Sequence, residues 1–342
     1  MMKVNPKRML LVFLNGIVGY LVITLLVSAF KSNEDTQSVV IAEPKREIEE
    51  EPFRQTDDNV DQEVALFTGE WWKQMLARQE ERKSRLRKVC HYLYNETVKD
   101  SSFLASHKNR LRPLIVNKKH RFIYSIVYKV GSTNWERVIV QDIEGFQNVP
   151  NQKLFSHKAL QWMPKFEEKE VEYYLEQYTK FIFVRNPLSR ILSGYRDKFV
   201  DHHNAVFSKL ARQIIRQYRS NMADDSSGSN VTFSEFISYL IDSGEHRVNP
   251  HWKPIFAQNM PCTIDYDVIG KLEEASDDIP YVLKKTGLWN VTDYGKGPPR
   301  RNTDKELVRQ YYSEVNPKLL KELYKVYEPD FLMFGYEMPF FL

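Results

Sequence analysis

The sequence of 342 residues predicts an α/β fold with a parallel sheet, in one domain that follows an N-terminal apolar segment. Two strand-like runs, at residues 122–128 and 180–184, are each followed by a short turn and a helix start, which is the repeating unit of a parallel sheet. No internal repeat or linker divides the chain after the first 67 residues, and the 275 residues that remain fit a single domain.

Residues 9–30 contain no charged side chain over 22 positions, which is enough for one helix to cross a bilayer. Lys3, Lys7 and Arg8 precede this run and predict that the N-terminus stays in the cytosol. A cleaved signal peptide is the alternative, but the apolar run is long for one and lacks a clear cleavage site. We therefore expect a cytosolic tail at 1–8, a transmembrane signal anchor at 9–30 and a lumenal remainder.

Residues 31–67 have the composition of a disordered lumenal stem, with many acidic and few large apolar side chains. The whole chain carries a net charge of +4, of which residues 1–30 contribute +3 and residues 31–65 contribute −7, so the remainder carries +8. A basic domain at 68–342 favours a polyanionic partner, although the charge could also be spread thinly over the surface.

Asn95, Asn230 and Asn290 each begin an Asn-X-Thr triplet, and three glycosylation acceptors favour the secretory pathway. Cys90 and Cys262 are too few for a disulfide framework and lack the spacing of a zinc site. One disulfide between them could form in an oxidising compartment.

Further elements follow from periodicity and capping signals. Apolar residues recur at helical spacing over 71–94, and Thr232 with Glu235 forms a capping box. The expected elements are helices at 71–94, 167–178, 196–220, from 233 and after 303, a strand at 266–269, and a closing segment at 329–336 docked on the core.

The first strand ends in a turn that has the composition of an anion cradle. Lys129 stands where the strand ends, Gly131 follows in the turn, and Ser132 and Thr133 offer hydroxyl donors at a helix start. The free N–H groups at a helix N-terminus favour negative charge, so the turn predicts phosphate binding. An ordinary turn with a solvated lysine is the alternative.

The second strand ends at Arg185, and Asn186 and Pro187 supply a helix cap and a first helical residue. Ser189 and Ser193 lie four residues apart and share one helix face. Guanidinium and hydroxyl donors therefore converge at a second strand end, which predicts a second phosphate site.

These two motifs resemble those of the Golgi carbohydrate sulfotransferases of the HNK-1 type, most closely their chondroitin 4-O-sulfotransferase branch. The resemblance covers roughly residues 89–339 and implies a P-loop-like sulfotransferase fold. The residues that match the 5′-phosphosulfate loop are Lys129, Val130, Gly131, Ser132, Thr133, Asn134 and Trp135. Those that match the 3′-phosphate motif are Arg185, Asn186, Pro187, Leu188, Ser189, Arg190, Ile191, Leu192 and Ser193.

Four positions depart from the family pattern. Ser132 replaces a cysteine, Asn186 replaces an acid, and Glu136 replaces a lysine, which removes a positive charge near the phosphosulfate. Asn259 stands where the family often has a further cysteine, which leaves Cys262 to pair with Cys90.

The resemblance implies that 3′-phosphoadenosine 5′-phosphosulfate (PAPS) is the sulfuryl donor and that no metal ion is required. It places Lys129 on the 5′-phosphate and bridging oxygen, with Ser132, Thr133 and Asn134 beside it. Arg185 and Ser193 would hold the 3′-phosphate. The implied partners are the Golgi membrane and a polyanionic glycan, with the 4-position of GalNAc in chondroitin as the acceptor, and no nucleic acid.

The catalytic base is expected to be a histidine, because an imidazole near its ordinary pKa suits a sugar hydroxyl. His157 lies between the two motifs, where the resemblance places a base, and His251 is the second candidate. Trp252 beside it could form a wall on which a sugar stacks.

Other functions are kept as alternatives. A nucleotide kinase is disfavoured because the sequence lacks GxxxxGK[ST]. A non-catalytic glycan-binding relative would keep the fold, and dermatan, terminal GalNAc and glucuronyl 3-O acceptors all fall within the family. Loops at 201–230 and 287–302 are expected to decide the acceptor.

Overall fold

The computed structural model describes residues 68–141, 159–201, 205–219, 230–244, 249–291, 294 and 305–337. The predicted cytosolic tail, signal anchor and stem, at residues 1–67, lie outside this part and stay predictions. Among the described residues, no helix is both long and apolar enough to cross a membrane. All of the described residues belong to one unit of the chain, Val60–Leu342.

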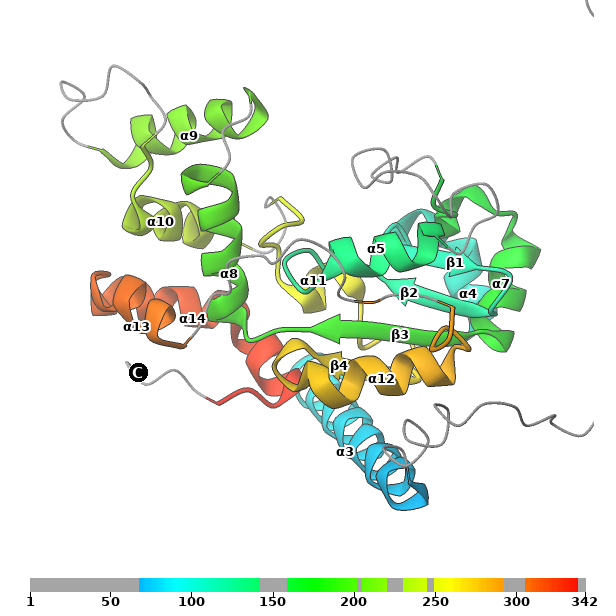
Figure 1. Cartoon of the computed structure of the whole chain (residues 1–342). Helices are drawn as coiled ribbons and strands as arrows, with labels where there is room; N and C mark the ends of the chain where they lie inside the picture. Colours follow the sequence, from blue (N-terminus) through cyan, green and yellow to red (C-terminus); the bar gives the residue numbers. More distant parts are fainter. Residues whose placement is uncertain are drawn as a thin grey trace, which may run out of the picture. The chain divides into compact units, whose positions relative to one another are not determined.

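Four strands form one sheet in the order β1-β2-β3-β4. Their bounds are β1 Leu114–Asn117, β2 Phe122–Ser125, β3 Thr179–Val184 and β4 Val268–Lys271. β2, β3 and β4 are parallel, and Ser125 pairs with Ile182, which pairs with Ile269. The carboxyl ends of β2 and β3 therefore meet at one edge of the sheet, where both arrowheads point in Figure 1.

The sheet is mixed, so the predicted parallel sheet is confirmed for β2, β3 and β4 but not at the β1 edge. β1 runs antiparallel to β2, with Leu114 opposite Ser125 and Asn117 opposite Phe122. Only the residues 118–121 join these two strands, and a connection this short can form a hairpin but not the crossover that parallel neighbours need.

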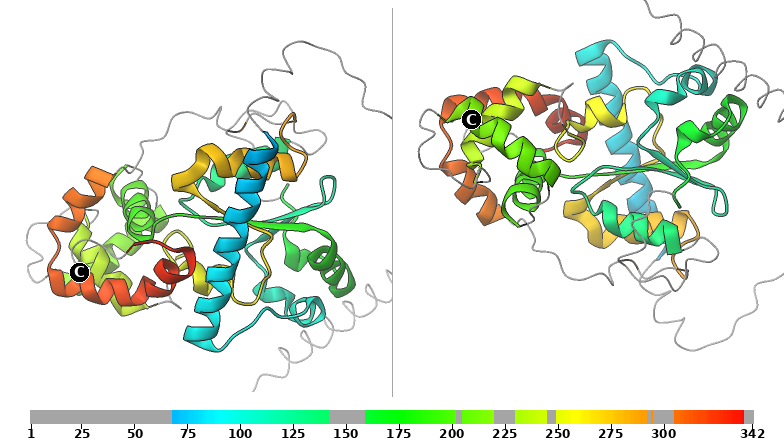
Figure 2. Two further views of the ribbon diagram at one scale, coloured as in Figure 1. Left: turned by 90° about the horizontal axis from the view of Figure 1, so that it is seen from below. Right: turned by 90° about the horizontal axis from the view of Figure 1, so that it is seen from above.

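Helices cover both faces of the sheet. In both views of Figure 2, α5 (Ser132–Gln141) and α12 (Ala275–Lys285) lie on one side of the strands, and α4 (Ser101–Ser106) and α7 (Glu168–Gln177) lie on the other. The strand residues are almost all buried, as expected for a sheet that is covered on both faces.

The long helix α3 (Gly69–Tyr94) lies against the β4 edge and corresponds to the helix predicted at 71–94. Its buried Arg82 donates from Nη1 to Ile269 O at 2.6 Å and to Asp278 Oδ2 at 2.9 Å. One guanidinium thus fastens α3 to a strand and to α12. Because the charge is matched by a buried carboxylate, it is satisfied away from water.

A second group of helices packs around aromatic side chains beyond the carboxyl ends of β2 and β3 (Figure 1). It consists of α8 Pro187–Tyr195, a π-helical turn Arg196–Val200, α9 Ala205–Tyr218, α10 Phe233–Ser243, α13 Lys305–Ser313 and α14 Pro317–Phe334. The capping box of Thr232 and Glu235 at the start of α10 is confirmed. The remaining short elements are α11 Ile255–Asn259 and the 3-10 turns Lys108–Arg110, Met163–Lys165 and Leu272–Glu274.

The closing segment predicted at 329–336 is not a separate element, because α14 runs through Pro329 and ends at Phe334. Asp330 follows the proline and is fully buried, and its carboxylate accepts from Ile255 N at 2.7 Å and from Phe256 N at 2.8 Å. Two N–H groups at the start of α11 are therefore held by the last helix of the fold, and the predicted docking of this segment is confirmed.

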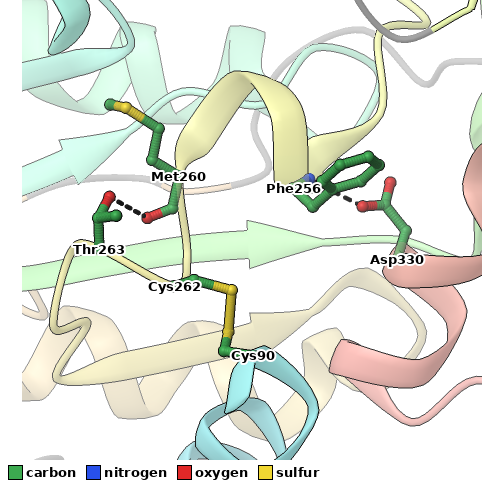
Figure 3. Close-up of a disulfide and its surroundings, with 6 residues drawn as sticks. All are labelled: Cys90, Phe256, Met260, Cys262, Thr263 and Asp330. Carbon is green, nitrogen blue, oxygen red and sulfur yellow. Dashed lines mark hydrogen bonds between the residues drawn. A yellow bond between two sulfur atoms is a disulfide. The ribbon is translucent and has the colours of Figure 1, made fainter. Parts of the chain in front are cut away.

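Cys90 and Cys262 form a disulfide, which confirms the pairing expected from the sequence. Figure 3 shows it joining the end of α3 to the loop after α11, beside Met260 and Thr263. Thr263 Oγ1 donates to Met260 O at 3.1 Å and tightens that loop. The bond therefore ties two segments that lie 172 residues apart in the chain.

Reduction of this disulfide is expected to lower the free energy of unfolding by about 2–5 kcal/mol, because the bond restricts the unfolded chain over a long loop. Urea unfolding with and without dithiothreitol measures the effect. The double variant Cys90→Ala/Cys262→Ala is the control and should unfold at the same urea concentration in both conditions. Equal midpoints for the wild-type protein with and without reductant would contradict the prediction.

Candidate active site

The two predicted anion-binding turns lie side by side at the carboxyl edge of the sheet. The first joins β2 to α5 and the second joins β3 to α8. Arg185 Nη1, from the second turn, donates a hydrogen bond to Lys129 O, in the first, at 3.2 Å. Two motifs that lie 56 residues apart in the chain are thus in direct contact.

The first turn has an unusual backbone, because both Lys129 (φ 69°) and Gly131 (φ 72°) lie in the left-handed region. This region is uncommon for a lysine, and residues held in it concentrate at functional sites. A side chain at position 131 would also place its Cβ 3.1 Å from Tyr294 Oη. α5 then begins at Ser132, so its first N–H groups are presented at the turn, as the sequence predicted.

Lys129 is held by an aspartate that the sequence analysis did not single out. Its Nζ lies 3.0 Å from Asp197 Oδ2, and Lys198 Nζ lies 2.9 Å from the same oxygen. Burial alone would raise the pKa of Asp197, but hydrogen bonds and charge from Lys198 and Lys129 outweigh it and lower the pKa to about 2. The carboxylate therefore stays ionised and gathers two ammonium groups at this edge.

In the second turn, the side chain of the half-buried Arg185 points toward the first turn, where it donates to Lys129 O. Burial lowers the pKa of Arg185, and the nearby Glu273 opposes that shift. Asn186 is committed elsewhere, because its side chain caps α8 by accepting from Leu188 N and Ser189 N. Its own N–H donates to Glu273 Oε1 at 2.8 Å.

Arg190 belongs to the predicted motif, but the structure places it beneath the site. Its side chain is only 1% exposed, with Nη1 donating to His251 O at 3.4 Å and Nη2 donating to Lys253 O. Burial raises the pKa of its neighbour Asp330 to about 6. Through its bonds to the carbonyls of His251 and Lys253, Arg190 fastens the segment that carries His251 to α8.

Several other motif residues also face the core, which leaves a ligand only their main-chain atoms. Three of them are largely buried, namely Ser132, Pro187 and Leu188. By contrast, four motif residues remain partly exposed at the site, namely Thr133, Asn134, Ser189 and Ser193. The motif residues with no more than 1% exposure, besides Arg190, are Val130, Trp135, Ile191 and Leu192.

His251 is the described histidine candidate, and its geometry suits a general base. Asn249 Oδ1 accepts from the main-chain N of His251 at 3.0 Å and lies 2.6 Å from its Nδ1. Because an amide oxygen only accepts, this contact places the ring proton on Nδ1 and leaves the lone pair on Nε2. The ring lies against Tyr128, with centroids 4.7 Å apart.

Burial, followed by the positive charges of Lys198 and Lys129, lowers the pKa of His251 to about 4, well below the ordinary value that the sequence analysis expected of the base. We expect an NMR titration of the ring to show a midpoint near pH 4 instead of the ordinary 6.5. The unfolded protein then binds more protons than the folded one between these values, so His251 makes the fold less stable as pH falls through this interval. The variant His251→Gln identifies the signal, and a midpoint at or above 6.5 would contradict the prediction.

The remaining predicted residues have varied outcomes. His157 lies outside the described residues, so its role stays a prediction. Trp252 is fully buried among aromatic side chains, so the hypothesis that its ring forms a sugar-stacking wall is wrong. Asn95, Asn230 and Asn290 are all exposed, as glycosylation would require. Over the described ranges, no group of three or more His, Cys, Asp or Glu side chains could hold a metal ion.

The arrangement can hold two anionic groups and accept one proton. Arg185 and Lys129 supply cations from two adjacent turns, α5 supplies N–H groups, and His251 supplies a neutral imidazole nearby. Cations and N–H groups can bind a donor that carries two anionic groups, and a neutral imidazole can accept the proton of a hydroxyl. Together they suit the transfer of an anionic group from such a donor to that hydroxyl.

Comparison with known proteins bears on the same region. The model of the "Sulfotransferase family" matches residues 112–337, which include both turns and His251. No solved structure matches the chain.

Three curated relatives illustrate the similarity. Carbohydrate sulfotransferase 14 of Danio rerio is 38% identical over 240 residues, which are 68% of this chain and 64% of that protein's length. Carbohydrate sulfotransferase 11 of Rattus norvegicus is 32% identical over 68% of this chain and 70% of its own. Carbohydrate sulfotransferase 10 of Xenopus laevis is 31% identical over 90% and 87%, respectively.

Proposed function

We propose, from the premise that the chain belongs to the sulfotransferase family, that it transfers a sulfuryl group from PAPS to a glycan hydroxyl. The proposed acceptor is the 4-position of GalNAc in chondroitin. The contact between Arg185 and Lys129 carries the proposal, because it unites the 3′-phosphate and 5′-phosphosulfate motifs in one site.

The residues present fit this donor. The half-buried guanidinium of Arg185 and the ammonium of Lys129 match two separated anionic groups. Gly131, whose φ is positive, leaves open the space that a Cβ would fill beside the N-terminus of α5. PAPS, when bound, supplies the sulfuryl group and a phosphate leaving group.

The chain's own residues then divide the work. Lys129 stabilises the negative charge that develops on the leaving group, and the N–H groups of α5 assist it. Arg185 fixes the 3′-phosphate, and its bond to Lys129 O couples that contact to the lysine's turn. His251 accepts the hydroxyl proton at Nε2 while Asn249 holds the opposite nitrogen.

The choice of chondroitin rests on the motif resemblance, because the curated relatives are several carbohydrate sulfotransferases at similar identity. Dermatan, terminal GalNAc and glucuronyl 3-O acceptors are the alternatives within the family. We further propose that the protein is a single-pass type II protein of the Golgi membrane with its catalytic domain in the lumen. The uncharged run at 9–30, the three exposed Asn-X-Thr asparagines and the disulfide support this location.

The test uses the soluble domain from Thr68 onward, radiolabelled PAPS and a panel of desulfated glycosaminoglycans, with the product disaccharides resolved by position. Label on the GalNAc 4-position of chondroitin is the expected result. Label only on another glycan would replace the acceptor and keep the reaction. No transfer, together with no binding of adenosine 3′,5′-bisphosphate by calorimetry, would overturn the proposed reaction.

The same assay separates the two histidines. His251→Ala is expected to lower kcat by about 10²–10⁴-fold, the usual contribution of a general base. If His157→Ala produces that loss while His251→Ala does not, the base is His157 and His251 has a positioning role.

A further inference from the structure

A cavity of about 970 Å³ lies beside the candidate active site. Its volume is at the upper end of the roughly 300–1,000 Å³ that is usual for small-molecule sites, which gives room for a segment of a larger ligand. The walls come from the end of α3, from α4 and the turn after it, from the end of β2, and from the segment 250–263.

The charged side chains in these walls are mostly basic. Lys99, Arg110, Arg112 and Lys253 line the cavity, and Glu96 is the single acidic residue among its lining. Within the described ranges, none of the four cations forms an ion pair with a carboxylate. Elsewhere in the same ranges, pairing of basic side chains is common, as at Arg82.

Cations that gather without acidic partners repel one another, and the arrangement favours a negatively charged ligand. The pairs that hold Arg78, Arg85 and Arg87 to nearby acids show that this fold neutralises other basic side chains. The four cations of the cavity therefore form a distinct surface, which we call the basic cleft.

Aromatic rings line the same cleft. Tyr128, Trp162 and Phe256 are partly buried, and Tyr94 and Phe103 are 39% and 40% exposed. Tyr94 stacks on Phe256, with centroids 5.9 Å apart. Flat apolar faces beside cations suit a ligand that alternates apolar ring faces with charged groups, as a chain of sugar rings and carboxylates does.

The cleft leads to the candidate base. Tyr128 lines the cleft and packs against the ring of His251, at 4.7 Å between centroids. Pro250 and Lys253, which flank His251 and Trp252, line it as well. Arg190 binds the carbonyls of both His251 and Lys253, so the cleft wall and the base are parts of one fastened segment.

We infer that the basic cleft is the acceptor site, and that its four cations recognise the carboxylate groups along the acceptor chain. This inference rests on the proposed function and adds to it the residues that bind the acceptor. Lys99, Arg110, Arg112 and Lys253 set the preference for a charged chain, and Tyr128 guides one sugar toward His251.

The test is the double variant Arg110→Gln/Arg112→Gln, which removes two exposed charges from one wall. The matched control, Lys318→Gln/Lys321→Gln, removes two exposed charges from the start of α14, outside the cleft. We expect the cleft variant to raise KM for desulfated chondroitin at least about tenfold, with kcat within about twofold. KM for a neutral GalNAc glycoside should be unchanged, as should both values in the control.

A second variant at the other two cations of the cleft, Lys99→Gln/Lys253→Gln, should produce the same shift, and thermal unfolding checks that all variants fold. Calorimetry with desulfated chondroitin separates this inference from the proposed reaction. If the wild-type protein binds the polysaccharide without transferring sulfate, and the cleft variants lose that binding, the reaction is overturned and the cleft stands. If the cleft variants and the control bind equally, or the wild-type protein binds no uronate polysaccharide, the cleft assignment is overturned.

Discussion

Replacement of Lys129 by methionine is expected to lower kcat by about 10²–10³-fold while the protein still folds. Removal of a single preorganised donor to developing charge has an effect of this size. Lys129 occupies the left-handed turn between β2 and α5, and its ammonium is held by Asp197 at 3.0 Å. Methionine keeps an unbranched side chain of nearly the same length and removes the charge together with its N–H donors.

The comparison variant is Lys198→Met, because Lys198 contacts the same carboxylate at 2.9 Å but lies over the ring of Phe207. Its loss should affect kcat much less than the loss of Lys129. Radiolabel transfer from saturating PAPS gives kcat, and circular dichroism checks the fold. A Lys129→Met enzyme within about threefold of the wild type would remove this lysine from the mechanism.

Replacement of Arg185 by alanine is expected to weaken binding of adenosine 3′,5′-bisphosphate by about 10- to 100-fold. A hydrogen bond to a charged group contributes about 1.5–3 kcal/mol, which corresponds to that range. The side chain is half-buried, so water would replace only part of its contacts. Its bond to Lys129 O would also be lost, which loosens the turn that carries the lysine.

The diagnostic measurement compares two donors by calorimetry, PAPS and adenosine 5′-phosphosulfate, which lacks the 3′-phosphate. The wild-type protein should prefer PAPS strongly, and the Arg185→Ala protein should lose most of that preference. Arg185→Lys keeps the charge without the forked geometry, so it should recover only part of the preference. An unchanged ratio in Arg185→Ala would place the 3′-phosphate elsewhere.

The sequence was sufficient to locate both turns, because each one follows a buried strand and opens a helix within a few residues. It did not locate β1, since the four residues of Leu114–Asn117 are too few for periodicity to separate a strand from a loop. The predicted strand at 122–128 ends at Ser125. Ile126 lies opposite Pro113 in the register of β1 and β2 and donates to its carbonyl at 2.8 Å, but a proline has no N–H to return the bond, and Ile126 O accepts from Asn259 instead. Such tertiary contacts leave no local pattern.

The same distinction applies to the site. The placement of Lys129 and Arg185 at one edge could be predicted, because each residue stands where a strand ends. Asp197 and Asn249 could not, since each acts through one side chain brought close by folding. The only local sign of Asp197 was its position four residues after Ser193, on the helix face that the serines define. Arg190 is the opposite case. It belongs to the continuous sequence motif, but its position on α8 directs its side chain into the core.

The disulfide closes a covalent ring that runs from Cys90 to Cys262 and includes both turns of the candidate site. A single proteolytic cut anywhere within that ring leaves the two fragments linked. On a non-reducing gel, nicked and intact molecules would therefore migrate as chains of the same mass, and only a reducing gel would separate them. Limited digestion therefore maps the cleavage sites within the ring only after the sulfur bridge is opened, whereas a cut outside the ring releases a fragment directly.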